Sequence, residues 1–296
     1  MTKMTLKEQI AAPEIVVAPG IYDAFSGAMA ESVGFCATYL SGASIAYTKL
    51  GRPDVGLVSF SEVAEILSNI RERIDIPIIV DADTGFGNAL NVQRTVRLFE
   101  RYGVNAIQLE DQSLPKRCGH LAGKTLVSAS EAVGKLNAAL DARISDELLI
   151  IARTDAIAVE GLNRALDRAE RYVEAGVDML FVEAPQNSQQ IKIILDRFAG
   201  RVPLMANMVE GGSTPMCSAP ELQQQGYSLA IFPGGLVRAR AKMERDYFLS
   251  LKQHGWNQPF KDKMLDLTGL NDLLGTQTIL ETGGRYDGKK FEDDND

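Results

Sequence analysis

The chain has 296 residues, 45% hydrophobic and 24% charged, with a formal net charge of −8. The acidic balance disfavours non-specific nucleic-acid binding, and no apolar run is long enough to span a membrane. Three widely spaced cysteines, an odd number, argue against a disulfide framework and for a reducing compartment. Residues 1–7 lack the apolar core of a signal peptide, so we expect a cytoplasmic protein.

Short β-branched runs alternate along the chain with longer segments that have the 3.6-residue period of a helix. Asp23 is placed to cap the first of these helices and Ser61 the second. The expected strands are 15–18, 37–40, 77–80, 104–109, 148–152, 179–182, 202–206 and 228–232, and the expected helices are 23–33, 61–73, 88–102, 129–142, 161–175, 189–198, a short one from 221, and 236–254.

Eight strands, each followed by a helix, predict a (β/α)8 TIM-type barrel of about 250 residues. A doubly wound open sheet is the competing fold, but polar residues at nearly every strand end favour the closed barrel. No Pro/Ser-rich linker divides the chain, so residues 1–255 are expected to form one barrel domain. We expect residues 256–290 to be a helical extension, with an apolar helix near 265–274, and 291–296 to be a disordered acidic tail.

Polar side chains stand at the carboxyl ends of the expected strands, which converge on one mouth in a barrel. One such residue alone would be explained as a strand-end cap or an ion pair. Four acids, an arginine and an asparagine together are too many for a packed core, because unpaired buried charge is costly. We therefore expect an active site formed by Tyr39, Ser41, Gly42, Asp81, Asp83, Glu110, Arg153, Glu183 and Asn207.

Asp81 and Asp83 leave the third strand as alternate residues, which point the same way, so both carboxylates can face one cation. With Glu110 nearby and no His or Cys spacing, these hard oxygen ligands favour Mg²⁺, or Mn²⁺, over Zn²⁺. Such an ion can polarise a hydroxyl or carbonyl oxygen of a carboxylate substrate, and Arg153 can grip the carboxylate.

The segment 116–120 places Lys116, Arg117, Cys118, Gly119 and His120 directly after the fourth strand. Neighbouring cations should lower the pKa of the thiol, which could then give or take a proton near neutral pH. The glycine would let an active-site loop bend. A basic surface loop with an incidental cysteine is the alternative.

Other features carry weaker signals. Glycine pairs at 211–212 and 234–235 follow the last two strands, where barrels often bind phosphate or carboxylate, and no Rossmann or P-loop glycine pattern is present. Cys36 and Cys217 have no charged neighbours and are expected to be buried core thiols. His254 lies near a helix end, where a helix-terminal role is expected.

In combination, five motifs resemble the isocitrate lyase / phosphoenolpyruvate mutase superfamily over residues 17–240. They are Tyr39-Leu40-Ser41-Gly42, Gly51-Arg52-Pro53-Asp54, Val80-Asp81-Ala82-Asp83-Thr84-Gly85-Phe86-Gly87, Lys116-Arg117-Cys118-Gly119-His120 and Ala152-Arg153-Thr154-Asp155-Ala156. The resemblance implies a barrel whose last helix is exchanged between subunits, a homotetramer built from such dimers, Mg²⁺, and a substrate related to pyruvate or oxaloacetate.

The cysteine loop is similar to that of the branch that cleaves carbon–carbon bonds in 2-hydroxy acids. The sequence of residues 153–162 is very similar to the matching segment of 2-methylisocitrate lyases. The sequence of residues 207–215 instead resembles that of 2,3-dimethylmalate lyases, because Gly211 stands where 2-methylisocitrate lyases usually carry Phe. Residues 267–273 contain no arginine to pair the third carboxylate of a tricarboxylate, which favours a dicarboxylate of the 2-alkylmalate type.

The resemblance also implies a role for each matching residue. The metal would be held by Asp81, Asp83, Asp54 and Glu110. Tyr39 is a candidate base, developing charge would be stabilised by Lys116 and Arg117, and Cys118, with its proton supplied by His120, would protonate the carbanion. The substrate would be bound by Ser41, Gly42, Ala43, Gly119, Arg153, Glu183, Asn207 and Arg238.

Two alternatives stay open at this point. An oxaloacetate hydrolase or decarboxylase would use the same metal and mouth, and a non-catalytic binding protein would keep only the barrel. The presence of every metal acid and of Cys118 argues against the second.

Overall fold

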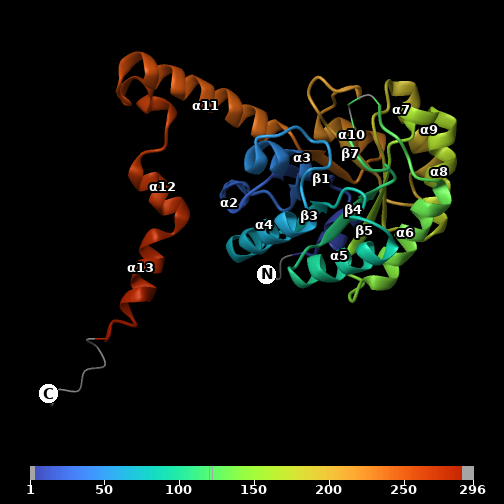
Figure 1. Ribbon diagram of the computed structural model, residues 1–296, viewed down its shortest axis with the longest axis horizontal. Helices are drawn as coiled ribbons and strands as arrows, with labels where there is room; N and C mark the ends of the chain where they lie inside the picture. Colours follow the sequence, from blue (N-terminus) through green and yellow to red (C-terminus); the bar gives the residue numbers. More distant parts are fainter. Residues whose placement is uncertain (1–3, 120, 122, 289–296) are drawn as a thin grey trace. The chain divides into compact units, whose positions relative to one another are not determined.

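A computed structural model describes residues 4–119, 121 and 123–288 (Figure 1). His120 and the predicted tail 291–296 lie outside the described residues. The chain divides into two compact units, Met1–Arg238 and Ala239–Asp296. The predicted domain boundary at residue 255 stays a prediction.

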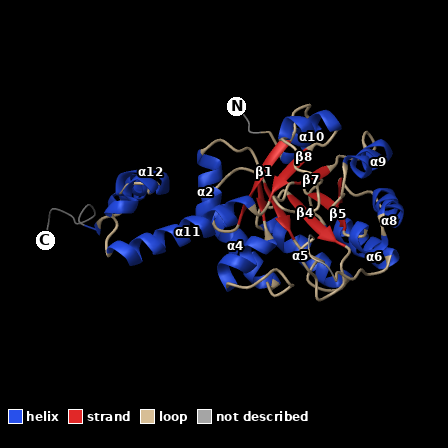
Figure 2. Ribbon diagram, turned by 90° about the horizontal axis from the view of Figure 1, so that it is seen from above, coloured by secondary structure: helices blue, strands red, loops and turns tan. Residues whose placement is uncertain are grey.

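The first unit is the predicted (β/α)8 barrel. Its eight strands are all parallel and follow the order β6-β5-β4-β3-β2-β1-β8-β7, with helices around them (Figure 2). The two ends of this sheet meet at a parallel bridge between Leu180 and Leu204, where the Leu180 amide donates to Pro203 O at 3.0 Å. The strands are β1 Val16–Ile21, β2 Thr38–Leu40, β3 Ile78–Asp81, β4 Ala106–Glu110, β5 Leu149–Thr154, β6 Met179–Val182, β7 Met205–Asn207 and β8 Leu229–Phe232.

The helices between the strands begin at capped positions. Asp23 caps α2 as predicted, accepting from the Ser26 amide at 2.7 Å. The cap of α4 is Ser59 rather than Ser61, because Ser59 and Glu62 form a reciprocal capping box and Ser61 lies inside the helix. The helices are α1 Leu6–Ala11, α2 Ala24–Ser32, α3 Gly42–Ile45, the π-helix η1 Ala46–Leu50, α4 Phe60–Arg73, α5 Ala89–Arg101, α6 Ala129–Ala142, α7 Ile157–Glu160, α8 Leu162–Glu174, α9 Ser188–Phe198, α10 Ala219–Gln225 and α11 Gly235–His254.

Helix α1 closes one end of the barrel interior. Its Leu6 and Ile10 are buried in the same apolar cluster as Val16 and Leu229, the first residues of β1 and β8. Burial at the amino ends of the strands leaves the carboxyl ends as the open end. The polar residues predicted to form a site therefore lie at the end of the barrel that can admit a substrate.

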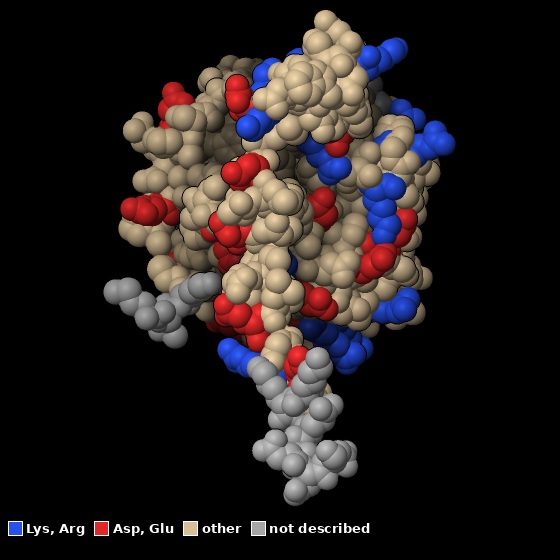
Figure 3. Space-filling view, turned by 90° about the vertical axis from the view of Figure 1, so that its left-hand side faces the viewer, with Lys and Arg blue, Asp and Glu red and all other residues tan. Residues whose placement is uncertain are grey.

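The cysteines differ from the prediction in one respect. Cys36 is exposed in the turn between α2 and β2, so its prediction as a buried core thiol is wrong, and Cys217 is half-buried; all three cysteines are free. On the face shown in Figure 3, both acidic and basic side chains are present. Among the helices of the described residues, none is long and apolar enough to cross a membrane.

The second unit consists of the rest of α11, the 3-10 helix η2 Gln258–Lys263, α12 Leu267–Leu274 and α13 Thr276–Gly284. Helix α12 lies where the apolar helix was expected. Among its described residues, Phe260 is the one buried side chain. Apolar side chains such as Phe248, Trp256 and Leu267 are 60–78% exposed.

Candidate active site

A pocket opens at the carboxyl ends of the strands and brings together most of the predicted site residues. Gly42 lies behind its wall, where a Cβ would be 3.4 Å from Asp81 Oδ2. The residues that line the pocket are Tyr39, Ser41, Ala43, Tyr47, Asp54, Asp81, Glu110, Lys116, Arg117, Cys118, Gly119, Arg153, Glu183, Asn207, Val209, Ile231, Pro233, Gly234 and Arg238.

Three carboxylates form the part of the site that can hold a metal ion. One oxygen each from Asp81, Asp83 and Glu110 lie within 4.8 Å of one another. Asp81 ends β3 and Glu110 ends β4, while Asp83 follows in the left-handed region at φ 46° and donates its amide to Asp81 Oδ1 at 3.1 Å. Burial raises the pKa of Asp83 to about 7 and that of Glu110 well above its usual range.

The donor set fits a hard divalent cation. Glu110 Oε1 is buried and has no hydrogen-bond partner among the described residues. Among the buried and half-buried side chains that the structure describes here, carboxylates also outnumber cations, and a divalent ion would balance them. Buried or half-buried around the pocket are six carboxylates and three cations, namely Asp54, Asp81, Asp83, Glu110, Asp155 and Glu183 against Lys116, Lys124 and Arg153.

Lys116 connects two of these acids. Its Nζ lies 2.5 Å from Asp54 Oδ1 and 2.6 Å from Asp83 Oδ1, and all three side chains are buried. Burial alone would lower the pKa of Lys116, but the charges of Asp83, Glu110 and Asp54 raise it well above its usual value. Asp54 is thus bound to Lys116 and is not one of the three grouped carboxylates.

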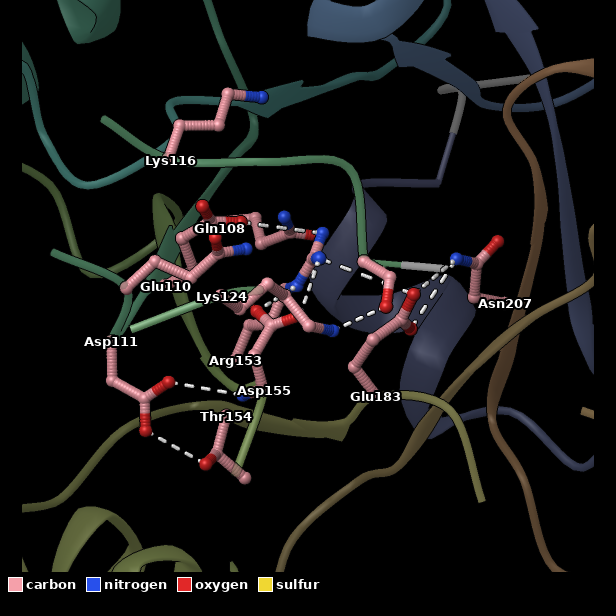
Figure 4. A network of polar contacts seen from close by, with 12 residues as sticks. Gln108, Glu110, Asp111, Lys116, Lys124, Arg153, Thr154, Asp155, Glu183 and Asn207 are labelled. Atoms are coloured by element: carbon pink, nitrogen blue, oxygen red, sulfur yellow. Dashed lines mark hydrogen bonds and ion pairs between the residues drawn. The ribbon is translucent and has the colours of Figure 1, made fainter. Parts of the chain in front are cut away.

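Arg153 occupies the centre of a second network (Figure 4). Its Nε and Nη2 donate to the two oxygens of Asp155 at 2.9 and 3.0 Å. Its Nη1 lies 3.4 Å from Glu110 Oε2, and Nη2 lies 3.9 Å from Glu183 Oε1. Although burial opposes its charge, these carboxylates raise the pKa of Arg153 well above its usual value, so the site always holds this cation.

Tyr39 is poorly suited to the role of base that was considered for it. Its hydroxyl donates to Gln108 Oε1 at 2.9 Å across the barrel interior. Burial raises the pKa of the phenol well above its usual value, and the charge of Asp81 raises it further. A neutral phenol that already donates a hydrogen bond does not accept a proton at neutral pH.

The loop that carries Cys118 is seated on the site. The side chain of Gln112 pairs with the backbone of Arg117 through two hydrogen bonds of 2.9 Å, and the Cys118 amide donates to Asp54 O at 3.3 Å. Gly119 is buried against Glu183 and Arg153, where a Cβ would overlap Glu183 Oε1 and lie 2.6 Å from Arg153 Nη2. A side chain at this position would therefore force Glu183 and Arg153, or the loop, to shift.

The opposite wall contains Asn207 and Arg238. Asn207 Nδ2 lies 3.2 and 3.3 Å from the two oxygens of Glu183, and its buried Oδ1 has no hydrogen-bond partner among the described residues. Arg238 forms an ion pair with Glu210, donates from Nη1 to Glu210 O at 2.7 Å, and donates from Nε to Gly234 O at 3.0 Å.

Residues 6–250 match the family model described as phosphoenolpyruvate phosphomutase. The chain belongs to this family. The relatives named below place it in the wider isocitrate lyase / phosphoenolpyruvate mutase superfamily, as the motifs indicated.

Several relatives of this family member are named lyases. It is 40% identical to the 2,3-dimethylmalate lyase of Eubacterium barkeri, over 96% of this chain and 98% of that protein. It is 45% identical to the 2-methylisocitrate lyase of Aeropyrum pernix, over 92% of this chain and 87% of that protein. A crystal structure of 2,3-dimethylmalate lyase superposes with a TM-score of 0.89 at 34% identity, covering 98% and 97% of the two chains.

An oxaloacetate acetylhydrolase bound to 3,3-difluorooxalacetate also has the same fold. Its TM-score is 0.89 at 30% identity, with 95% of each chain covered. The family thus includes both lyases and a hydrolase on one barrel, so the residues around the pocket must decide between the reactions.

Sequence reasoning missed several residues of this site. Asp155 was quoted within a motif without a role, although it leaves β5 as the alternate residue after Arg153 and faces the same way. Lys124, Gln108 and Gln112 gave no signal, because their partners are distant in sequence or are backbone atoms. Tyr47 lines the pocket from the π-helix η1, an element that the sequence did not predict.

The close approach of Gly119 gives a testable expectation for the loop. In Gly119→Ala the new methyl group would push the loop off Glu183 and Arg153, an overlap that costs about 1–3 kcal/mol. We expect backbone amides of residues 113–125 to exchange with deuterium faster, on the order of 10-fold, as measured by mass spectrometry. Gly134→Ala is the control, because that exposed position in α6 has open space around it. Unchanged exchange in Gly119→Ala would show that the loop tolerates a side chain there.

Proposed function

We propose that the chain is a Mg²⁺-dependent carbon–carbon lyase. It would cleave a 2-hydroxy dicarboxylate of the 2,3-dimethylmalate or other 2-alkylmalate type into pyruvate and a second carboxylic acid. The observation that carries this proposal is that two of the three grouped carboxylates, Asp81 and Glu110, line the same pocket as Arg153 and Cys118. A metal-chelating substrate could thus contact a carboxylate-binding cation and a thiol proton donor in one place.

Each part of the pocket then has a task. Asp81, Asp83 and Glu110 would hold Mg²⁺, which when bound supplies a Lewis acid for the hydroxyl and carboxylate oxygens of the substrate. Arg153, fixed on one edge by Asp155, would bind a carboxylate through Nη1. Lys116 would hold Asp83 and Asp54 in place rather than contact the substrate directly.

The proton transfers follow from the same geometry. Tyr39 would act as a neutral hydrogen-bond donor, so a carboxylate of the site, and not the phenol, would accept the hydroxyl proton. The C2–C3 bond would then break in the retro-aldol sense. Cys118 Sγ would protonate the carbanion carbon of the departing fragment, and the seated loop would exclude water. A proton supply through His120 stays part of the proposal.

A dicarboxylate is favoured over a tricarboxylate by the charges on the far wall. Arg238 is the cation of the pocket closest in sequence to β8. Its guanidinium group is already paired with Glu210 and donates hydrogen bonds to two backbone carbonyl groups. Residues 267–273 supply no arginine. A third carboxylate would therefore find Arg238 already paired, and leaving that charge unpaired in the pocket is costly.

Two other reactions have specific support. The 45% identity to a 2-methylisocitrate lyase supports cleavage of 2-methylisocitrate to pyruvate and succinate. The similarity to an oxaloacetate acetylhydrolase supports cleavage of oxaloacetate to oxalate and acetate, or its decarboxylation. The products separate all of these reactions.

The substrate proposal is tested by pyruvate release, coupled to lactate dehydrogenase, from 2,3-dimethylmalate, 2-methylmalate, 2-methylisocitrate and oxaloacetate. We expect the alkylmalates to be turned over and Cys118→Ser to reduce their kcat by about 10²–10⁴-fold, the range for a lost proton donor. A preference for 2-methylisocitrate would contradict the dicarboxylate argument. Oxalate and acetate from oxaloacetate, without pyruvate from any substrate, would replace the lyase by the hydrolase.

The metal site is tested without any substrate. We expect Mn²⁺ titrated calorimetrically into EDTA-treated protein to bind at one site, and Asp81→Asn to weaken that binding by at least about 10-fold, because a ligand is lost. Asp196→Asn, an exposed acid on α9, is the matched control. Equal Mn²⁺ affinity in wild type and Asp81→Asn would place the metal elsewhere.

We also propose the homotetramer, with α11 exchanged between subunits. The support is the second unit, whose described residues bury one side chain and expose Phe248, Leu249, Ile279 and Leu280 by 55–67%. Sedimentation velocity should give a mass about four times 32.2 kDa, and Phe248→Asp should lower it. Leu90→Asp, at an exposed position of α5, should not. A monomeric wild type would contradict the proposal.

A further inference from the structure

Lys124 is a buried cation that lies outside the pocket and has no part in the reaction as described above. Its side chain is 1% exposed, and that of its partner Asp155 is fully buried. Nζ donates to Asp155 Oδ1 at 2.9 Å and to the carbonyl oxygen of Gly119 (Figure 4). One ammonium group therefore ties the cysteine loop to a side chain at the end of β5.

The two contacts of Lys124 connect the proposed carboxylate-binding residue, Arg153, with the loop that carries the proposed proton donor, Cys118. Asp155 Oδ1, which accepts from Lys124, also accepts from Arg153 Nη2 at 3.0 Å, so lysine and arginine share one carboxylate. Gly119 is the neighbour of Cys118 and is itself buried against Arg153 and Glu183. A displacement of Lys124 would thus change the position both of the loop that carries Cys118 and of Arg153, the arginine proposed to bind substrate.

We propose that Lys124 is a positioning residue, which holds Cys118 at its proton-donating position through Gly119 and holds the plane of Arg153 through Asp155. This inference rests on the proposed function for what the thiol does, but not for the geometry. A lysine suits the task because its ammonium group has three donors and can serve a carbonyl and a carboxylate together. The contrasting explanation is a structural ion pair that only stabilises the barrel.

Lys124→Met separates these explanations. The variant keeps the length and apolar stem of lysine, and it leaves Asp155 paired with Arg153 by two hydrogen bonds, so the barrel should still fold. We expect iodoacetamide at pH 8.5 to alkylate Cys118 about 5- to 10-fold faster than in wild type, because the loop is released. Peptide mass spectrometry measures the rate at each cysteine separately.

Cys36 and Cys217, both free, serve as internal controls in the same sample. A positioning role predicts unchanged rates at these two thiols, whereas general loosening of the barrel would accelerate half-buried Cys217 as well. Lys192→Met removes an exposed lysine of α9 and should change none of the three rates. Unchanged alkylation of Cys118 in Lys124→Met, or equal acceleration of Cys217, would overturn the inference.

Kinetics supply the second measurement, on whichever substrate the wild type turns over. We expect kcat to fall about 10- to 100-fold in Lys124→Met, because the proton donor is misplaced, with KM changed less. Lys124→Arg keeps the charge and should recover part of kcat; it also serves as the test variant should the Met protein fail to fold. Full activity in Lys124→Met would overturn the positioning role. An inactive wild type would instead count against the proposed function, and the alkylation rates would still decide the role of Lys124.

Discussion

Every cation buried at the mouth of this barrel is shared among several oxygen groups. Lys116 joins Asp54 to Asp83, Lys124 joins Asp155 to the Gly119 carbonyl, and Arg153 contacts Asp155, Glu110 and Glu183. These partners come from the ends of different strands, from the cysteine loop and from the loop between η1 and α4. Since buried acids outnumber buried cations among the described residues there, loss of any one cation reduces the compensation of the carboxylates that it contacts. The sharing therefore fixes the strand ends and the loop relative to one another.

The barrel and the location of its site could be predicted because both depend on local patterns. Strand and helix periods show in short windows, and the carboxyl ends of parallel strands meet whatever the details of packing. Helix α1 was missed although Thr5 and Glu8 form a capping box that the sequence displays. Other features depend on contacts across the barrel: the Tyr39 hydroxyl meets Gln108, 69 positions away, and Lys124 meets Asp155, 31 positions away. The exposure of Cys36 likewise follows from the turn in which it lies, and not from its neighbours in sequence.

Asp81 and Asp83, at the end of β3, lie together as predicted but for a different structural reason. The strand alternation of Asp81 and Asp83 was expected to point both carboxylates at one ion. In the structure β3 ends at Asp81, and Asp83 adopts φ 46° in a turn where its own amide binds the Asp81 carboxylate. Aspartate tolerates this left-handed conformation better than most residues, yet it still costs energy that a surrounding structure must offset. The ion pair to Lys116 and the hydrogen bond from Glu110 N to Asp83 O provide that support.

In the proposed mechanism, the choice between lyase and hydrolase would depend on whether the Cys118 thiol or a water molecule reaches the reacting carbon. Gly119 lies directly on Glu183 and Arg153, so the backbone beside Cys118 is itself part of the wall that would face a bound carboxylate. Pairing of Ser113 with Thr125 and of Gln112 with Arg117 closes the base of the same loop. In the proposed reaction, a thiol on a loop that also covers the site would protonate carbon away from bulk water. Hydrolysis would need an ordered water in the same space, so the loop position that suits protonation by the thiol would disfavour hydrolysis.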